Sequence, residues 1–135
     1  MKNFLLITLT VFALSACSKE DPLQHEKSRL VGFWQLTEIT GGIAGTGYEA
    51  NFDHLQMTNN NRYTLMVYDS FIQEGDYDLT IENDQLTIRF IPDSADTIIF
   101  DDFEKAVLFS EEDRKLVLSD PCCDLYVYLF EKEGE

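Results

Sequence analysis

The chain has 135 residues and a formal net charge of −15, and 44% of its residues are hydrophobic and 13% aromatic. This length corresponds to one domain, large enough to bury a core that needs no covalent staples. The apolar content excludes a disordered acidic tail, because such tails cannot bury enough surface to offset chain entropy. The acidic balance argues against nucleic acid as a partner, since phosphate binding requires clustered Lys and Arg.

Residues 1–16 have the composition of a lipoprotein signal peptide. A positive charge on Lys2 precedes an apolar run from Phe4 to Leu14. The run is shorter than the roughly twenty residues that a transmembrane helix needs. A charged and then apolar start is typical of a secretory signal. The stretch Leu14-Ser15-Ala16-Cys17 resembles the bacterial lipobox, whose cysteine is linked to diacylglycerol and becomes the mature N-terminus.

Cys17 is therefore the expected lipidation site, and its acyl chains are the expected contact with the membrane. Two or three acyl chains hold a protein on a membrane lastingly, whereas one chain does not. The stretch Ser18-Lys19-Glu20-Asp21 resembles the signal by which lipoproteins of Bacteroidetes reach the cell surface. We expect a lipid-anchored outer-membrane protein exposed at the cell surface. A periplasm-facing anchor is the alternative, as is an ordinary cleaved signal with a chance cysteine.

Residues 17–29 are predicted to form a lipidated tether. The segment from Ser18 to Ser28 is polar and charged, and Pro22 is expected to break any helix there. From Leu30 the character of the sequence changes. Short runs rich in Val, Ile, Thr, Tyr and Phe alternate with clusters of Asn, Asp, Gly and Pro, a pattern typical of strands and turns. We place the folded domain at residues 30–132.

The runs predict strands at regular intervals, separated by turns and by a Gly-rich loop at 41–47. Asn83-Asp84 is predicted to form a tight hairpin turn between two of these strands. The predicted strands are 32–39, 52–57, 63–68, 75–81, 85–91, 97–100, 105–109, 115–119 and 125–131. No segment of the domain sustains the periodicity of a helix. Short strands at such intervals are typical of an all-β sandwich or barrel. About eight strands in about a hundred residues favour an antiparallel up-and-down barrel.

Alternation along the strands predicts which side chains face the barrel interior. Tyr77 and Leu79, for example, alternate with Asp76 and Asp78. The predicted interior residues, which are also the candidate ligand contacts, are Trp34, Leu36, Tyr63, Leu65, Tyr77, Leu86, Ile88, Phe90, Tyr126 and Tyr128. The alternative is that these side chains simply fill a core. The last predicted strand is apolar on both faces, so both faces are expected to be covered.

Several motifs, in this order, resemble those of the small lipocalin-like lipoproteins common in Bacteroidetes. They are a Gly-X-Trp opening at 32–34, a Gly-X-Tyr strand at 75–77, a Lys-Leu-X-Leu strand at 115–118 and a closing aromatic strand at 126–130. The resemblance spans the domain and implies a barrel whose signature Trp34 plugs the closed end. Lipocalins usually stack an arginine on that tryptophan. Near this C-terminus only Lys132 could take its place.

The sequence carries no pattern of catalysis, and we predict no catalytic residue, cofactor or metal. His25 falls in the predicted tether and His54 in a short strand, so a Ser/His/Asp arrangement is not apparent. No glycine pattern of a phosphate or dinucleotide site is present. Acidic clusters at 101–104 and 111–113 lack the spacing of a calcium loop. A solvated acidic surface is the favoured interpretation, over hydrolysis by paired carboxylates.

Cys122 and Cys123 are the thiols that remain if Cys17 is lipidated. In an oxidising compartment a disulfide between them is possible. Two free thiols, a bridge to another chain and a soft-metal site are the alternatives.

Together these features predict a membrane-anchored, non-enzymatic lipocalin-like barrel. The leading hypothesis is that it binds a small hydrophobic ligand through the barrel mouth, with the 41–47 loop as a lid. The alternative is a module with a solid core that meets or inhibits another protein of the envelope. A hydrolase using the acidic clusters is a third hypothesis.

Overall fold

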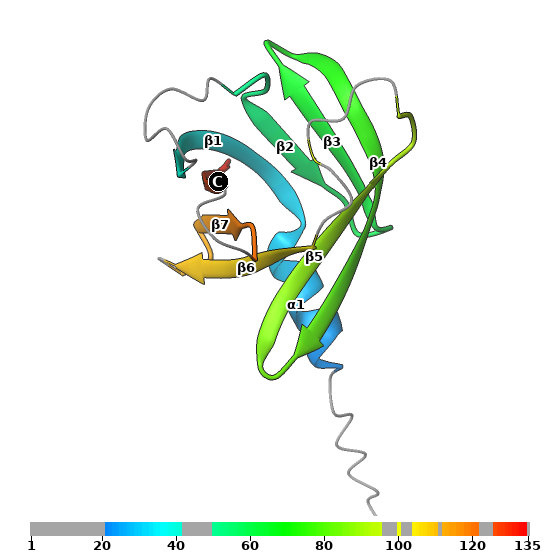
Figure 1. Cartoon of the computed structure of the whole chain (residues 1–135), viewed down its shortest axis with the longest axis vertical. Helices are drawn as coiled ribbons and strands as arrows, with labels where there is room; N and C mark the ends of the chain where they lie inside the picture. Colours follow the sequence, from blue (N-terminus) through cyan, green and yellow to red (C-terminus); the bar gives the residue numbers. More distant parts are fainter. Residues whose placement is uncertain are drawn as a thin grey trace, which may run out of the picture.

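The strands of the protein close into a barrel (Figure 1). The computed structural model describes residues 21–41, 50–95, 100, 104–110, 112–121 and 126–134. These contain the helix α1 (Pro22–Leu30) and eight strands. The strands are β1 (Gly32–Gly41), β2 (His54–Met57), β3 (Arg62–Val67), β4 (Ser70–Glu82), β5 (Gln85–Pro92), β6 (Glu104–Ser110), β7 (Lys115–Ser119) and β8 (Tyr126–Glu133).

Every strand pairs antiparallel with the next in the chain, and β8 returns to pair with β1. This up-and-down order confirms the predicted all-β class and the antiparallel barrel of about eight strands. The predicted strand at 97–100 falls mostly outside the described residues, and Phe100 is not part of a strand. Gly41 ends β1, and the rest of the predicted Gly-rich loop also lies outside the described residues.

Tight turns connect several of the strands. Tyr68 and Asp69 connect β3 to β4, and Asn83 and Asp84 connect β4 to β5, all four with positive φ. Positive φ at both central residues gives a turn whose twist matches that of the paired strands. The predicted hairpin at Asn83-Asp84 is thereby confirmed, and it is a position where Asn and Asp tolerate the left-handed region better than other residues do.

The long strand β4 pairs with two neighbouring strands, β3 and β5. Its first half pairs with β3, from Val67 opposite Ser70 to Arg62 opposite Asp76, and its second half runs on with β5 alone. Gly75 stands where β3, β4 and the end of β5 meet. A methyl group at this position would overlap the carbonyl oxygen of Ile91 in the backbone of β5. The Gly of the predicted Gly-X-Tyr motif is therefore required for the close approach of two strands.

Residues 22–30 form a helix, so the expectation that Pro22 breaks any helix in this segment is wrong. Asp21 caps the helix, since its carboxylate accepts a hydrogen bond of 3.0 Å from the backbone N–H of Leu23. Pro22 occupies the first turn, where a missing N–H costs no helical hydrogen bond. The proline therefore starts the helix instead of preventing it.

The helix ends on the barrel at Trp34, the tryptophan of the Gly-X-Trp motif. The indole nitrogen of Trp34 donates a hydrogen bond of 2.8 Å to the carbonyl of Leu30, the last residue of α1. Lys132 of β8 lies with its ammonium 5.1 Å from the Trp34 ring. Gly32 leaves room for that side chain, because an added methyl group would lie 2.7 Å from Lys132 Cε. Lys132 thus takes the place that the family resemblance gives to an arginine.

We predict that Gly75→Ala lowers the free energy of unfolding by about 3 kcal/mol, because the methyl group forces β4 and β5 apart. Urea denaturation of the wild type and the variant measures this difference. Glu74→Ala is the control, since Glu74 is the exposed neighbour in the same strand and its loss should change stability by less than about 0.5 kcal/mol. Equal stability of Gly75→Ala and wild type would contradict the strand crossing.

Candidate functional site

The predicted interior residues all belong to the hydrophobic core. Eight of them are buried, namely Trp34, Tyr63, Leu65, Tyr77, Leu86, Ile88, Phe90 and Tyr128. The other two, Leu36 and Tyr126, are partly buried and pack against that core. Alternation therefore identified the inward face correctly on every strand where it was applied. The structure brings these side chains together, and whether they bind a ligand stays a prediction.

Aromatic rings that the strand pattern missed fill the interior between them. Phe100, which is 0% exposed, lies with its ring centroid 4.6 Å from that of Phe90 and 5.2 Å from those of Phe52 and Tyr128. Such separations are those of aromatic rings in direct contact. Phe52 and Phe100 fall within the predicted strands 52–57 and 97–100, but both lie outside the observed strands, so alternation does not set the direction of either side chain. Phe130 is also buried, and alternation with Tyr128 could have found it.

A buried glutamine holds Phe100 in place. The side-chain amide of Gln73 donates hydrogen bonds of 2.6 Å to the Tyr63 hydroxyl and 3.1 Å to the carbonyl of Phe100. Its carbonyl oxygen accepts a bond of 3.3 Å from the backbone N–H of Phe100. A buried amide needs such partners, because a buried polar group without a hydrogen bond destabilises the fold. Gln73 therefore fixes both the position of Phe100 and the orientation of Tyr63.

The hydroxyls of Tyr63 and Tyr77 are buried in the barrel interior, and burial raises the pKa of both. Burial raises the pKa of Tyr63 even though the hydrogen bond from Gln73 lowers it. Burial also raises the pKa of Tyr77 to about 12. The Tyr77 hydroxyl donates a hydrogen bond of 2.7 Å to the carbonyl of Thr58. Both phenols are therefore neutral and serve as hydrogen-bonding groups within the core.

An ion pair lies inside the barrel near Phe100 and Tyr128. Lys105 is 2% exposed, and its ammonium is 2.5 Å from a carboxylate oxygen of Asp120. The same ammonium lies 5.5 Å from the Phe100 ring and 5.7 Å from the Tyr128 ring. Lys105 alternates with Val107 in the sequence, and this was the signal that it faces inward. A buried lysine survives in such a place only when its charge is paired.

His54 lies between two carboxylates on the outside of the barrel. Its Nδ1 is 2.7 Å from Asp53 Oδ1 and its Nε2 is 3.2 Å from Glu133 Oε1. The ring also stacks on Phe33, with centroids 5.0 Å apart. Burial lowers the pKa of His54, but the hydrogen bonds and charges of both carboxylates outweigh it, so the pKa is raised overall. This arrangement suits an imidazolium that joins β2 to β8.

Asp53 also supports the turn between β3 and β4. Its second carboxylate oxygen accepts a hydrogen bond of 3.0 Å from the backbone N–H of Tyr68. Burial raises the pKa of Asp53, but the hydrogen bonds from Tyr68 and His54 lower it more, and the net pKa is depressed. His54, Asp53 and Tyr68 therefore form one chain of hydrogen bonds from β2 to the turn.

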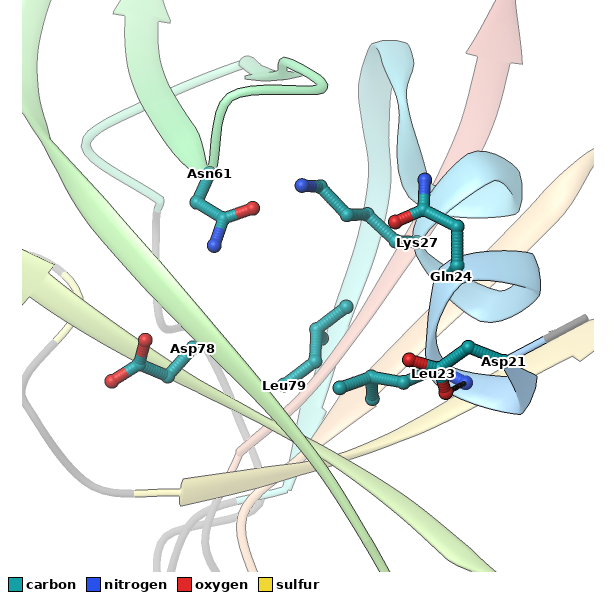
Figure 2. A pocket seen from close by; sticks show the side chains of 7 residues that line it. All are labelled: Asp21, Leu23, Gln24, Lys27, Asn61, Asp78 and Leu79. Atoms are coloured by element: carbon teal, nitrogen blue, oxygen red, sulfur yellow. Dashed lines mark hydrogen bonds between the residues drawn. The ribbon is translucent and has the colours of Figure 1, made fainter.

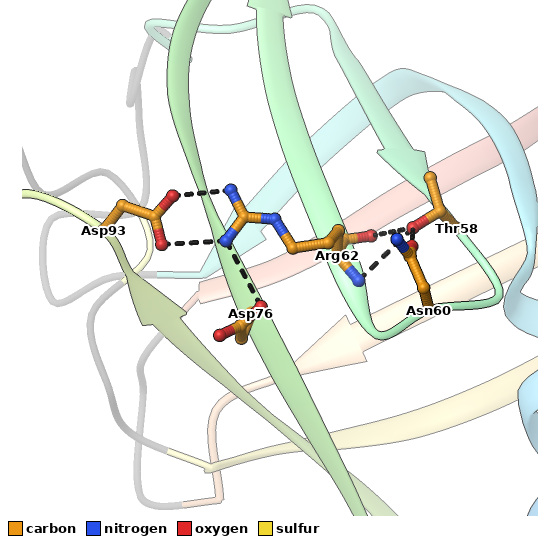
Figure 3. Close-up of polar contacts among 5 residues, drawn as sticks. All are labelled: Thr58, Asn60, Arg62, Asp76 and Asp93. Atoms are coloured by element: carbon orange, nitrogen blue, oxygen red, sulfur yellow. Dashed lines mark hydrogen bonds and ion pairs between the residues drawn. The ribbon is translucent and has the colours of Figure 1, made fainter.

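Asp76 and Asp78 on the outer face of β4 are paired with arginines. Arg62 contacts Asp93 through two bonds, of 2.9 and 2.5 Å, and Asp76 through a third of 3.2 Å (Figure 3). Arg89 contacts Asp78 at 3.1 Å. Paired carboxylates on one strand would otherwise repel each other. Because each of these carboxylates faces an arginine, the pair does not form the open acid–base site that a glycosidase needs.

Two of the pockets that the described residues form lie on the outside of the barrel beside α1. The first, of about 260 Å³, lies between α1 and β4 (Figure 2). It is lined by Asp21, Leu23, Gln24, Lys27, Asn61, Asp78 and Leu79. The second, of about 300 Å³, is formed by Asp21, Gln24, His25 and Ser28 on the helix itself. Both are at or below the lower end of the 300–1,000 Å³ range of ligand sites, and neither is lined by a predicted interior residue.

Several predicted site residues lie outside the described part of the chain. These are Cys17, Cys122 and Cys123, together with residues 42–47 of the predicted lid and residues 101–103 and 111 of the acidic clusters. Among the residues that the structure describes, no group of three His, Cys, Asp or Glu side chains is placed to hold a metal ion. No helix within the described ranges has the length and hydropathy needed to cross a membrane.

Comparison with known proteins gives no match. No protein-family model, no curated protein and no solved structure is significantly similar to this chain.

We predict that His54 adds to stability at low pH and loses that contribution as pH rises. Its pKa is raised above the ordinary value of 6.5 in the folded state, so protonation favours folding below 6.5 and this effect fades as pH passes through the raised pKa. The free energy of unfolding should therefore fall more steeply with pH in wild type than in His54→Asn. The difference should reach about 1 kcal/mol at most, as for partly exposed ion pairs.

Denaturation at a series of pH values measures this slope. Gln56→Asn is the control, because Gln56 is an exposed side chain of the same strand as His54 and carries no titratable group. That variant should keep the wild-type slope. If His54→Asn also kept it, the bridge between Asp53 and Glu133 would be refuted.

Proposed function

We propose that this chain is a lipid-anchored, non-enzymatic, lipocalin-like barrel of the bacterial outer membrane that binds a protein partner with its outer surface. The anchor is the lipid on Cys17, and the family assignment rests on the order of motifs from Gly32 to Phe130. The one observation that favours surface binding over carriage of a ligand is the packing of Phe100 at the centre of the barrel.

An eight-stranded barrel is just wide enough to be filled by side chains or to hold one small ligand. Here Trp34 fills the end next to α1, and Phe100 with its aromatic neighbours fills the interior beyond it. A ligand at that place would have to displace Phe100 and break its hydrogen bonds with Gln73. Leaving a buried amide unpaired costs about 1–3 kcal/mol in addition to the lost ring contacts. This cost disfavours a carrier.

The outer surface, in contrast, offers unburied aromatic side chains at the turn between β3 and β4. Tyr68 is 87% exposed and Phe71 is 74% exposed. Leu108 on β6 is the next most exposed large apolar side chain among the described residues. Aromatic residues are enriched at protein interfaces, where they contribute most of the binding free energy. This turn is therefore the described surface that best fits a protein partner.

The polar groups of the barrel support a role without catalysis. Lys105 is paired with Asp120, His54 lies between Asp53 and Glu133, and the interior phenols are neutral. Catalysis would need a nucleophile or a base within reach of a substrate. These groups instead satisfy one another and hold strands together.

We expect Phe100→Ala to separate the two hypotheses. If the interior is a solid core, the variant should lose about 3–5 kcal/mol of stability. The wild type should show the same native mass with and without a lipid extract of its host, and should not raise the fluorescence of N-phenyl-1-naphthylamine. An adduct of defined mass on the wild type, lost from Phe100→Ala without loss of stability, would contradict the proposal and identify a carrier.

Phe71→Ala is the matched control for this experiment. Because Phe71 is exposed, its removal should leave the free energy of unfolding within about 0.5 kcal/mol of wild type. The same variant should weaken photo-crosslinking of the barrel to its partner in the cell envelope. Unchanged crosslinking would remove the turn from the binding surface.

A further inference from the structure

The helix α1 is fixed to one end of the barrel by contacts from three other elements. Besides the bond from Trp34 of β1 to Leu30, the Lys132 ammonium of β8 donates a bond of 3.3 Å to the carbonyl of Arg29. The Arg29 guanidinium contacts Asp113, in the turn between β6 and β7, at 2.9 and 2.6 Å. It also lies 4.1 Å from the centre of the Phe109 ring. The helix and the barrel therefore move as one body.

This attachment shortens the free chain between the barrel and the proposed lipid. Cys17 precedes Asp21, the capping residue of α1, by four residues. Four residues span at most about 14 Å when fully extended. A tether over residues 17–29, as the sequence suggested, would have reached about three times as far. The start of α1 must then lie close to the bilayer surface.

The start of α1 and the exposed aromatic turn lie at opposite ends of the molecule. Figure 1 shows α1 beside the turn between β4 and β5, with the turn between β3 and β4 at the far end. Leu23 at the start of α1 faces Leu79 of β4 across the pocket of Figure 2. From Ser70 at one end of β4 to Glu82 at the other there are 13 residues, or about 40 Å of strand at 3.3 Å per residue.

We propose that the lipid on Cys17 holds the barrel with α1 and the β4–β5 turn toward the membrane and with Tyr68 and Phe71 pointing away from it. This orientation rests on the lipid anchor of the proposed function. The end of the barrel that carries α1 faces the lipid surface, because the chain between α1 and the lipid is short. In the anchored molecule Tyr68 and Phe71 therefore do not insert into the membrane. They face the solution on the side away from the bilayer.

Tether length and steric exclusion set this orientation, and surface charge does not. The chain has a net charge of −15, so anionic headgroups repel it. A bilayer without anionic lipids should therefore orient the protein in the same way as the natural membrane does. A longer flexible segment before α1 should remove the orientation, because nothing else holds the barrel to the lipid.

The test uses the mature lipoprotein, labelled with ¹⁵N, in phosphatidylcholine nanodiscs that contain a lipid with a gadolinium chelate on its headgroup. Mass spectrometry of the N-terminal peptide first establishes the acyl chains on Cys17. The paramagnetic lipid should then broaden the amide signals of Leu23, Asn83 and Asp84 strongly. It should leave those of Tyr68 and Phe71 as sharp as in nanodiscs without gadolinium.

The control carries a Gly/Ser insert of about twenty residues between Glu20 and Asp21, which adds a root-mean-square reach of about 25 Å. Its barrel should show weaker broadening, no longer confined to α1 and the β4–β5 turn. An acylated protein whose Tyr68 and Phe71 signals broaden as much as that of Asn83 would overturn the orientation alone. The orientation would also be overturned if the Gly/Ser insert left the pattern of broadening unchanged. Absence of acyl chains on Cys17 would overturn the lipid anchor, and the orientation with it.

Discussion

The hydrogen bond from the Trp34 indole to the carbonyl of Leu30 joins the helix to the barrel, and much of the structure depends on it. The last carbonyls of a helix lack partners within the helix, and a buried indole N–H also needs one. Each group here satisfies the other where α1 meets the barrel. The Lys132 ammonium lies over the indole ring and donates a hydrogen bond to the carbonyl of Arg29. Trp34 thereby connects the end of α1 to β1, and Lys132 connects it to β8.

Within the described part of the chain, the buried side-chain nitrogen and oxygen atoms of the interior also all have hydrogen-bond partners. Gln73 bonds Tyr63 and the backbone of Phe100, Tyr77 bonds the carbonyl of Thr58, and Lys105 faces Asp120. Between these groups, aromatic rings occupy the space that a ligand would need. In a barrel this narrow, the hydrogen bonds of the buried polar groups and the ring packing support our proposal that the protein binds a partner with its outer surface. On the outside, Arg62 of β3 and Arg89 of β5 pair with carboxylates that composition alone would suggest as a catalytic cluster.

Much of the barrel could be predicted from the sequence because alternation has a physical cause in the pleat of a strand. Alternation placed Tyr77, Ile88 and Tyr128 inward, and the turn residues Asn83-Asp84 predicted a hairpin. Phe52 and Phe100 were assigned to predicted strands, but they lie outside the observed ones, where side chains follow no period. The helix was missed because Pro22 was interpreted as a breaker when it occupies the one turn that tolerates proline. Lys105 was missed because burial of a charge depends on Asp120, which is distant in the sequence and adjacent only in the fold.

The docking of α1 on the barrel is the central claim, and hydrogen exchange of the Trp34 indole proton tests it most directly. That proton is easily resolved, since the chain has one tryptophan. If the bond to Leu30 holds, the indole should exchange only when the whole barrel unfolds, with the same denaturant dependence as the backbone amides of β1 and β8. Exchange at the rate of an exposed indole while those amides stay protected would mean that the helix is not docked.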